Sequence, residues 1–243
     1  MAYLLSLAVP GVRRALPTRW EHPIGAYGLL LLVVGNYLGL FVAPSERMMG
    51  EAGRILYVHV PAAWLAMLCF LVAGVFAASF LFTSNRKWDS AMEAVCEVGV
   101  MEGALLLILG AIFGRPTWGA WWTWDPRLTT SAVMLLSFVG VLLLRSVVQD
   151  PDRRATWSSI ATILSAVNVP IVYAAVKYRG LHQQASEQFA NQTSTIDGTM
   201  RWVLYFNTFA FLFLTVWFVA QRARLAERRA EAEMPEPLPE VSL

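Results

Sequence analysis

Residues 61–83 read PAAWLAMLCFLVAGVFAASFLFT, and this stretch contains no charged side chain. Because a helix needs about 20 mostly apolar residues to cross the hydrocarbon core of a bilayer, the stretch is typical of a transmembrane helix. The composition agrees with this interpretation, since 57% of the 243 residues are hydrophobic and only 15% are charged. The sequence therefore predicts an integral membrane protein.

Similar apolar stretches recur along the chain and are separated by short polar joints. They predict an all-α integral membrane protein whose six transmembrane helices form a single domain over residues 1–243. The predicted spans are residues 24–42, 61–83, 92–113, 128–148, 156–177 and 202–221. The tail that follows begins as a charged helical continuation and ends rich in Pro and Glu, so we expect it to be disordered from about residue 225.

The distribution of Lys and Arg predicts the orientation, because these residues are more frequent in cytoplasmic loops. Six spans place both termini on one side, and 12 of the 19 Lys and Arg residues lie in the segments on that side. We therefore expect both termini in the cytoplasm. Most of the other seven are expected to be anchors at helix ends. Arg54, Arg115 and Arg127 are candidates for pairing with the carboxylates of an anionic ligand.

Residues 115–130, RPTWGAWWTWDPRLTT, form the most unusual stretch, because they hold four of the ten tryptophans. Tryptophans at a membrane interface would explain one or two of them. Four together, interrupted by Gly119, offer flat apolar faces that suit a large planar ligand. Asp125 precedes Pro126 and an apolar run, so we expect Asp125 to cap a helix that begins at Pro126. The four tryptophans are Trp118, Trp121, Trp122 and Trp124.

Counting membrane crossings places His59 and His182 on the same face as the tryptophans, and His22 on the opposite face. His59 stands in YVHVPAAW, where we expect Pro61 to start a helix and the imidazole to lie at the water boundary. His182 follows Gly180, a candidate C-terminal cap. A single interfacial histidine is often only a polar anchor. Two of them beside an aromatic surface are what axial ligation of haem iron requires, whereas the missing Cys and carboxylate ligands do not favour zinc.

Three polar residues fall inside predicted spans, namely Glu97, Glu102 and Asn168, the last of which precedes Pro170. Such residues are costly in lipid, so we expect them to face protein. There we expect them to form packing hydrogen bonds and a helix kink. A relay role is the less favoured alternative. The net charge of +2 does not suggest a nucleic-acid partner, and the sequence has no phosphate-binding glycine loop or Walker lysine. We expect no ATPase activity.

The segment WGAWWTWDPRLT, together with YVHVPAAW, NVPIVYAAV and LHQQAS, resembles the haem-handling proteins of cytochrome c assembly that carry a WWD motif, and among them the CcmC family. The resemblance covers about residues 24–217. Two departures are Pro126, where Ala is expected, and Lys177-Tyr178, where two Trp are expected. The resemblance implies that His59 and His182 are the axial ligands of haem iron. It also implies a haem-contacting segment made of Trp118, Gly119, Trp121, Trp122, Trp124 and Asp125.

The resemblance further implies a function. The protein would hold haem b, as cargo, at the periplasmic face of the bacterial inner membrane and promote its covalent attachment to a histidine of the haem chaperone CcmE. It would act as a lyase-like scaffold without catalytic side chains of its own, beside CcmD, the ATPase CcmA and the membrane subunit CcmB. One alternative is an ABC-type permease subunit that exports haem, and another is an electron-transfer b-type cytochrome. Both histidines lie at one face rather than near the midplane, where transport sites usually sit, which favours the scaffold.

Overall fold

The computed structural model describes residues 21–46, 49–177 and 197–232, and all its regular elements are helical. The elements are α2 (Glu21–Tyr37) with a π-helical turn η2 (Leu38–Val42), a 3₁₀-helix η3 (Glu51–Ile55), α3 (Leu56–Thr83), α4 (Arg86–Trp118), α5 (Pro126–Val147), α6 (Pro151–Ala166), α7 (Asn168–Lys177) and α8 (Gly198–Ala232).

Six helical segments of the described residues are long and apolar enough to cross a membrane. They are Pro23–Val42, Glu51–Thr83, Arg86–Trp118, Pro126–Val147, Pro151–Ala175 and Gly198–Ala232. Large apolar side chains on their outer faces are exposed, for example Phe82 at 89% and Leu136 at 66%. Exposed apolar surface of this extent fits a lipid environment rather than water. The all-helical, six-span prediction is therefore confirmed.

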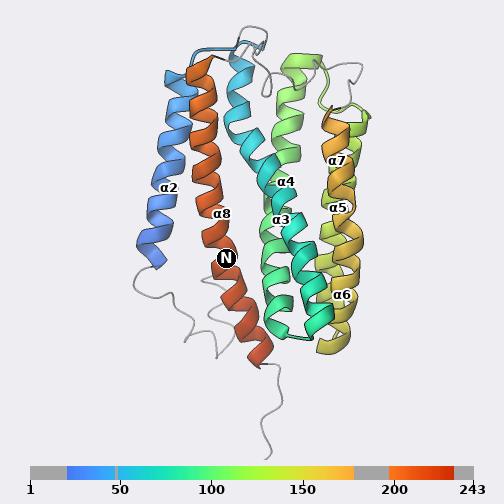
Figure 1. Ribbon diagram of the computed structural model, residues 1–243. Helices are drawn as coiled ribbons and strands as arrows, with labels where there is room; N and C mark the ends of the chain where they lie inside the picture. The colour runs from blue at the N-terminus through green and yellow to red at the C-terminus, as the bar shows by residue number, and fades with distance from the viewer. Residues whose placement is uncertain (1–20, 47–48, 178–196, 233–243) are drawn as a thin grey trace, which may run out of the picture.

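The helices form a bundle in which chain neighbours are mostly antiparallel (Figure 1). α2 packs on α8, α8 packs on α3 and α4, and α5 packs on α4, α6 and α7. In the core, the rings of Phe70 on α3 and Phe138 on α5 stack with centroids 3.9 Å apart. Gly99 of α4 leaves room for Phe70, because a Cβ at Gly99 would lie 2.8 Å from its ring. α2 starts and α8 ends at the same end of the bundle (Figure 1).

Local signals fix the helix ends. Asn85 accepts a hydrogen bond from the Lys87 N–H at 3.0 Å and caps α4, directly after Ser84, whose φ of 55° ends α3. Asp150 accepts one from the Arg153 N–H at 2.7 Å and caps α6, whose first residue is Pro151. These short caps reverse the chain within a few residues, so consecutive helices lie side by side.

The structure corrects two predicted boundaries. The second span was expected to begin at Pro61, but η3 leads directly into α3, so Pro61 lies inside a helix. A proline removes one backbone hydrogen bond, which packed membrane helices tolerate. The tail was expected to be disordered from about residue 225, but α8 continues to Ala232. Its composition between 222 and 232, rich in Ala, Glu and Arg, favours a helix.

The predicted kink in the fifth span is confirmed. α6 ends at Ala166 and α7 begins at Asn168, so the span is broken at Val167, three residues before Pro170. The Asn168 amide donates a hydrogen bond of 3.1 Å to the carbonyl of Thr130 on α5. The polar side chain therefore faces protein and ties the break to the neighbouring helix.

Candidate functional site

The candidate site lies at the end of the bundle where α4 stops and α5 starts, which we call the loop end. Residues 118–125, from the end of α4 to the residue before α5, are called the tryptophan loop. η2 ends, and α3 and α8 begin, at the same end (Figure 1). The crossing count that placed His59 and the tryptophans together is therefore confirmed.

The tryptophan loop is fixed where it leaves α4. Gly119 has a φ of 79°, and its N–H donates to the carbonyl of Arg115 at 3.1 Å. Such a left-handed C-cap strongly favours glycine. The Arg115 guanidinium in turn donates to the carbonyl of Gly119. Gly119 thus sets the direction of the loop.

The loop is equally fixed where it enters α5. One carboxylate oxygen of Asp125 accepts a hydrogen bond from the Leu128 N–H at 3.0 Å, and the other accepts one from the Thr123 hydroxyl at 3.1 Å. Pro126 occupies the first helical position. The predicted capping role of Asp125 is confirmed, and both of its oxygens serve the loop's own geometry.

The four tryptophans differ in their surroundings. Trp121 is 59% exposed and Trp124 is 82% exposed, so both present apolar surface. Trp122 packs edge-on to Trp124 at 5.7 Å, and its indole nitrogen is buried without a hydrogen-bond partner among the described residues. Trp118 is half-buried and meets the ring of Phe113 edge-on at 5.7 Å. Trp121 and Trp124 are therefore the accessible faces of the loop.

His59 lies within α3, not ahead of it as expected from Pro61. Its imidazole packs against α4 at Gly110, where a Cβ would lie 3.2 Å from His59 Cε1. The backbone of Leu106 lies beside the ring but completes no hydrogen bond of normal geometry, so the buried Nδ1 has no partner in the described part of the chain. Buried polar atoms of this kind are rare and call for an explanation.

Arg127 connects the histidine to the loop. Its guanidinium carbon lies 5.7 Å from the centre of the Trp118 ring, a cation–π contact. It is also close enough to His59 for the two side chains to interact electrostatically. The structure therefore brings together His59 from α3, Trp118 from α4 and Arg127 from α5.

The other two candidate arginines already bond backbone carbonyls. One terminal nitrogen of Arg54 donates to the carbonyls of Gly39 at 2.9 Å and Ala43 at 2.8 Å, and its Nε donates to Glu51. Arg54 therefore ties η3 to the end of η2. Arg115 is exposed and bonds Gly119. His182 lies outside the described residues, in the joint between α7 and α8.

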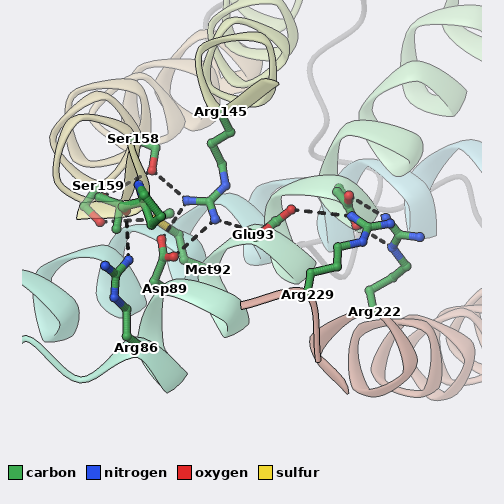
Figure 2. A network of polar contacts seen from close by, with 12 residues as sticks. Arg86, Asp89, Met92, Glu93, Arg145, Ser158, Ser159, Arg222 and Arg229 are labelled. Atoms are coloured by element: carbon green, nitrogen blue, oxygen red, sulfur yellow. Dashed lines mark hydrogen bonds and ion pairs between the residues drawn. The ribbon is translucent and has the colours of Figure 1, made fainter. Parts of the chain in front are cut away.

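Figure 2 shows a second polar cluster, which the sequence did not predict. It lies at the opposite end of the bundle, where α4 begins and α5 ends. Arg145 of α5 donates to both carboxylate oxygens of Asp89 on α4, at 2.6 and 3.2 Å. It also bonds Glu93 at 2.7 Å and the Ser158 hydroxyl at 2.7 Å. The acidic residues Asp89, Glu93 and Glu97 recur every four positions along α4. That spacing is a signal in the sequence, but it does not identify the partners.

Glu97 and Glu102 face protein, as predicted. Glu97 forms an ion pair with Arg222 of α8, which is labelled in Figure 2. Glu102 is 4% exposed, and one of its oxygens accepts a hydrogen bond from the Thr215 hydroxyl at 3.0 Å. Both contacts join α4 to α8.

Residues 3–236 match the family described as heme exporter protein C. The heme exporter protein C of Bradyrhizobium diazoefficiens is 32% identical over 232 residues, which cover 94% of this chain and 88% of that protein. That of Haemophilus influenzae is 34% identical, covering 85% and 84%. That of Escherichia coli is 31% identical, covering 84% and 83%. The chain therefore belongs to the heme exporter protein C family.

Proposed function

We propose that this protein holds haem at the periplasmic face of the bacterial inner membrane and promotes its covalent attachment to the haem chaperone CcmE. The observation that carries the proposal is the convergence of His59, Trp118 and Arg127 beside an exposed aromatic loop at one end of the bundle. A family whose members are named heme exporters supports haem as the cargo. In this proposal both termini lie in the cytoplasm, as the excess of Lys and Arg on their side favours.

In the proposed site, His59 and His182 supply the two axial ligands of haem iron. In this proposal Nε2 of His59 is the ligating ring nitrogen, because Nδ1 is buried in the protein. His59 is held on a rigid helix, whereas His182 comes from the joint between α7 and α8. Ligands from two separate elements allow the haem plane to lie between them.

The exposed faces of Trp121 and Trp124 would cover the haem ring. Each presents a large apolar surface at the loop end, and Gly119 and Asp125 hold the loop between two fixed helix ends. Preorganised aromatic surface binds a planar ligand with little loss of conformational freedom. In this arrangement, Asp125 contributes to haem binding by fixing the loop.

Arg127 is the strongest candidate to pair with a haem propionate. Its guanidinium lies over Trp118 and near His59. Arg54 and Arg115 are weaker candidates, because their guanidinium groups already bond backbone carbonyls. A charged pair with Arg127 would fix the rotation of the haem in its plane.

The proposed activity is that of a scaffold. The histidines would hold the iron, the tryptophans would hold the plane of the ring, and Arg127 would hold a propionate. One vinyl edge of the haem would then remain open to the incoming chaperone. Holding two reactants in a productive geometry replaces a bimolecular search and supplies a large part of the rate. The proposed partners are CcmE, CcmD, the ATPase CcmA and the membrane subunit CcmB, with haem b as cargo.

A permease subunit that exports haem is the second candidate, and the name of the related proteins favours it. Transport sites usually lie near the midplane of the membrane. Glu97 pairs with Arg222 in the half of α4 away from the loop end, and Glu102, near the middle of α4, accepts a hydrogen bond from Thr215 through one of its two oxygens. The scaffold therefore accounts better for the residues at the loop end.

The two candidates are separated by measuring covalent haem on CcmE with the ATPase CcmA omitted. The scaffold predicts that the wild-type protein still yields haem-bound chaperone, and that His59→Ala and His182→Ala each abolish it. His22→Ala is the matched control, because its predicted place is the opposite face. Failure of the wild-type protein to load any chaperone without the ATPase would contradict the scaffold and support the permease.

A further inference from the structure

Two glycines of α4 lie beneath the candidate site. Gly110, Gly114 and Trp118 are spaced by four residues, so they share one face of the last turns of α4. The imidazole of His59 rests on Gly110, and the tryptophan loop folds back over Gly114. Both glycines are buried.

The two contacts differ in kind. A Cβ at Gly110 would lie 3.2 Å from Cε1 and 3.9 Å from Nδ1 of His59, so the end of a side chain would have to give way. A Cβ at Gly114 would lie 2.9 Å from the backbone oxygen of Ala120 and 3.3 Å from Cε3 of Trp118. There the loop backbone itself would have to shift. The ring of Trp118 in turn forms the cation–π contact with the guanidinium of Arg127.

Space, rather than helix stability, explains glycine at these positions. A glycine inside a helix is less favourable than alanine. The close approach of the imidazole and of the loop offsets this cost, because dense packing between elements needs a position without a side chain. Gly140 of α5 provides a contrast, since a Cβ there would meet no atom of the described residues within 4 Å.

We infer that Gly110 and Gly114 are positioning residues of the haem site. Gly110 sets how deeply the His59 imidazole sits against α4, and Gly114 sets how closely the tryptophan loop approaches the same helix. This inference rests on the proposed function, in which His59 ligates iron and the loop covers the ring. The inference adds that the positions of His59 and of the tryptophan loop are determined by two glycines that do not themselves contact haem.

The two variants have different expected effects. Gly110→Ala pushes the imidazole outward, so haem still binds but its absorption spectrum shifts and its release becomes roughly tenfold faster, as small misplacements of a reacting group have large effects. In the haem-free protein the same variant exposes His59 and increases its modification by diethylpyrocarbonate. Gly114→Ala displaces the loop, so haem retention falls while the modification of His59 stays at the wild-type level.

The test uses the purified full-length protein in detergent, with Gly110→Ala, Gly114→Ala, Gly140→Ala as the matched control, and His59→Ala. Peptide mass spectrometry measures the modification of His59 in haem-free protein, with His22 as internal reference. Absorption spectroscopy measures the bound haem. Thermal unfolding of the haem-free variants checks that all are folded. We expect the glycine-to-alanine variants to fold, because alanine has a higher helix propensity than glycine.

The inference is supported if Gly110→Ala alone increases the modification of His59 and also shifts the haem spectrum. It is overturned if Gly110→Ala matches Gly140→Ala in both measurements while His59→Ala alters the spectrum. If His59→Ala leaves the haem spectrum unchanged, the proposed ligand is wrong. The modification rate of His59, which needs no haem, still decides in that case whether Gly110 positions the imidazole.

Discussion

Arg145 and Asp89 form an ion pair in which both side chains are only 7% exposed, and which joins α5 to α4 at the end of the bundle opposite the tryptophan loop. Arg145 also binds Glu93, which lies 3.9 Å from Arg229 of α8 (Figure 2). Because Arg145 also bonds Ser158 of α6, the pair lies in a network that connects four helices, α4, α5, α6 and α8. α4 runs as one continuous helix from this network to the tryptophan loop.

Replacing Arg145 by Gln is expected to lower the free energy of unfolding by about 3–5 kcal/mol, because it leaves Asp89 buried without its cation. Arg153→Gln is the matched control, since Arg153 is exposed at the start of α6. Equilibrium unfolding in detergent and SDS measures both. Equal stability of the two variants would show that the network contributes little to the fold.

Glu97 and Glu102 should respond differently to replacement by Gln. Glu97 pairs with a cation, Arg222, whereas the described partner of Glu102 is the neutral hydroxyl of Thr215. A neutral amide can accept the Thr215 hydrogen bond, so we expect Glu102→Gln to change the unfolding free energy by less than about 1 kcal/mol. Glu97→Gln should be clearly more destabilising in the same assay. The reverse order would mean that the charge of Glu102 has a role which its contacts do not reveal.

Asp125 can be tested as a helix cap. Asn caps helices about as well as Asp, so Asp125→Asn is expected to retain haem binding. Asp125→Ala removes both acceptors and should cost about 1 kcal/mol in stability and release the loop, with loss of bound haem. Haem titration and thermal unfolding of the two variants decide the matter. A loss of haem with Asn as large as that with Ala would mean that the negative charge itself is needed.

Arg127 is expected to contact a propionate. Arg127→Gln should weaken haem binding by about tenfold or more, the effect of losing a hydrogen bond to a charged group. Haem dimethyl ester lacks the propionate charges, so the variant and the wild-type protein should bind it equally. Arg115→Gln is the control, because the guanidinium of Arg115 bonds the carbonyl of Gly119. An equal loss with the ester would assign Arg127 to packing against Trp118.

The sequence was sufficient to predict the membrane spans, because a bilayer requires long apolar helices whatever their partners. The cap at Asp125 and the break near Asn168 were also predictable, since both depend on neighbours in the chain. The predicted start of α3 at Pro61 is wrong, because the preceding 3₁₀-helix leads directly into α3 and already sets the direction of the chain.

Contacts between segments that are distant in the chain could not be predicted from the sequence. Arg145 is one of the 12 Lys and Arg residues that the sequence places in segments on the side of the termini, but the structure buries it against Asp89, 56 positions away. The contact of His59 with Gly110 depends on how α3 crosses α4, which no local pattern specifies. Likewise, the crossing count predicted the end at which His59 lies, but not its packing against Gly110 or its electrostatic interaction with Arg127.

The central claim is that His59 and His182 ligate the haem iron beside the tryptophan loop. The most direct measurement is the absorption and electron paramagnetic resonance spectrum of haem bound to the purified protein, compared for His59→Ala, His182→Ala, the double variant and the control His22→Ala. The account predicts that each single variant changes the axial-ligand signature, that the double variant loses most of its haem, and that His22→Ala matches the wild-type protein. Unchanged haem content and an unchanged spectrum in the double variant would contradict it.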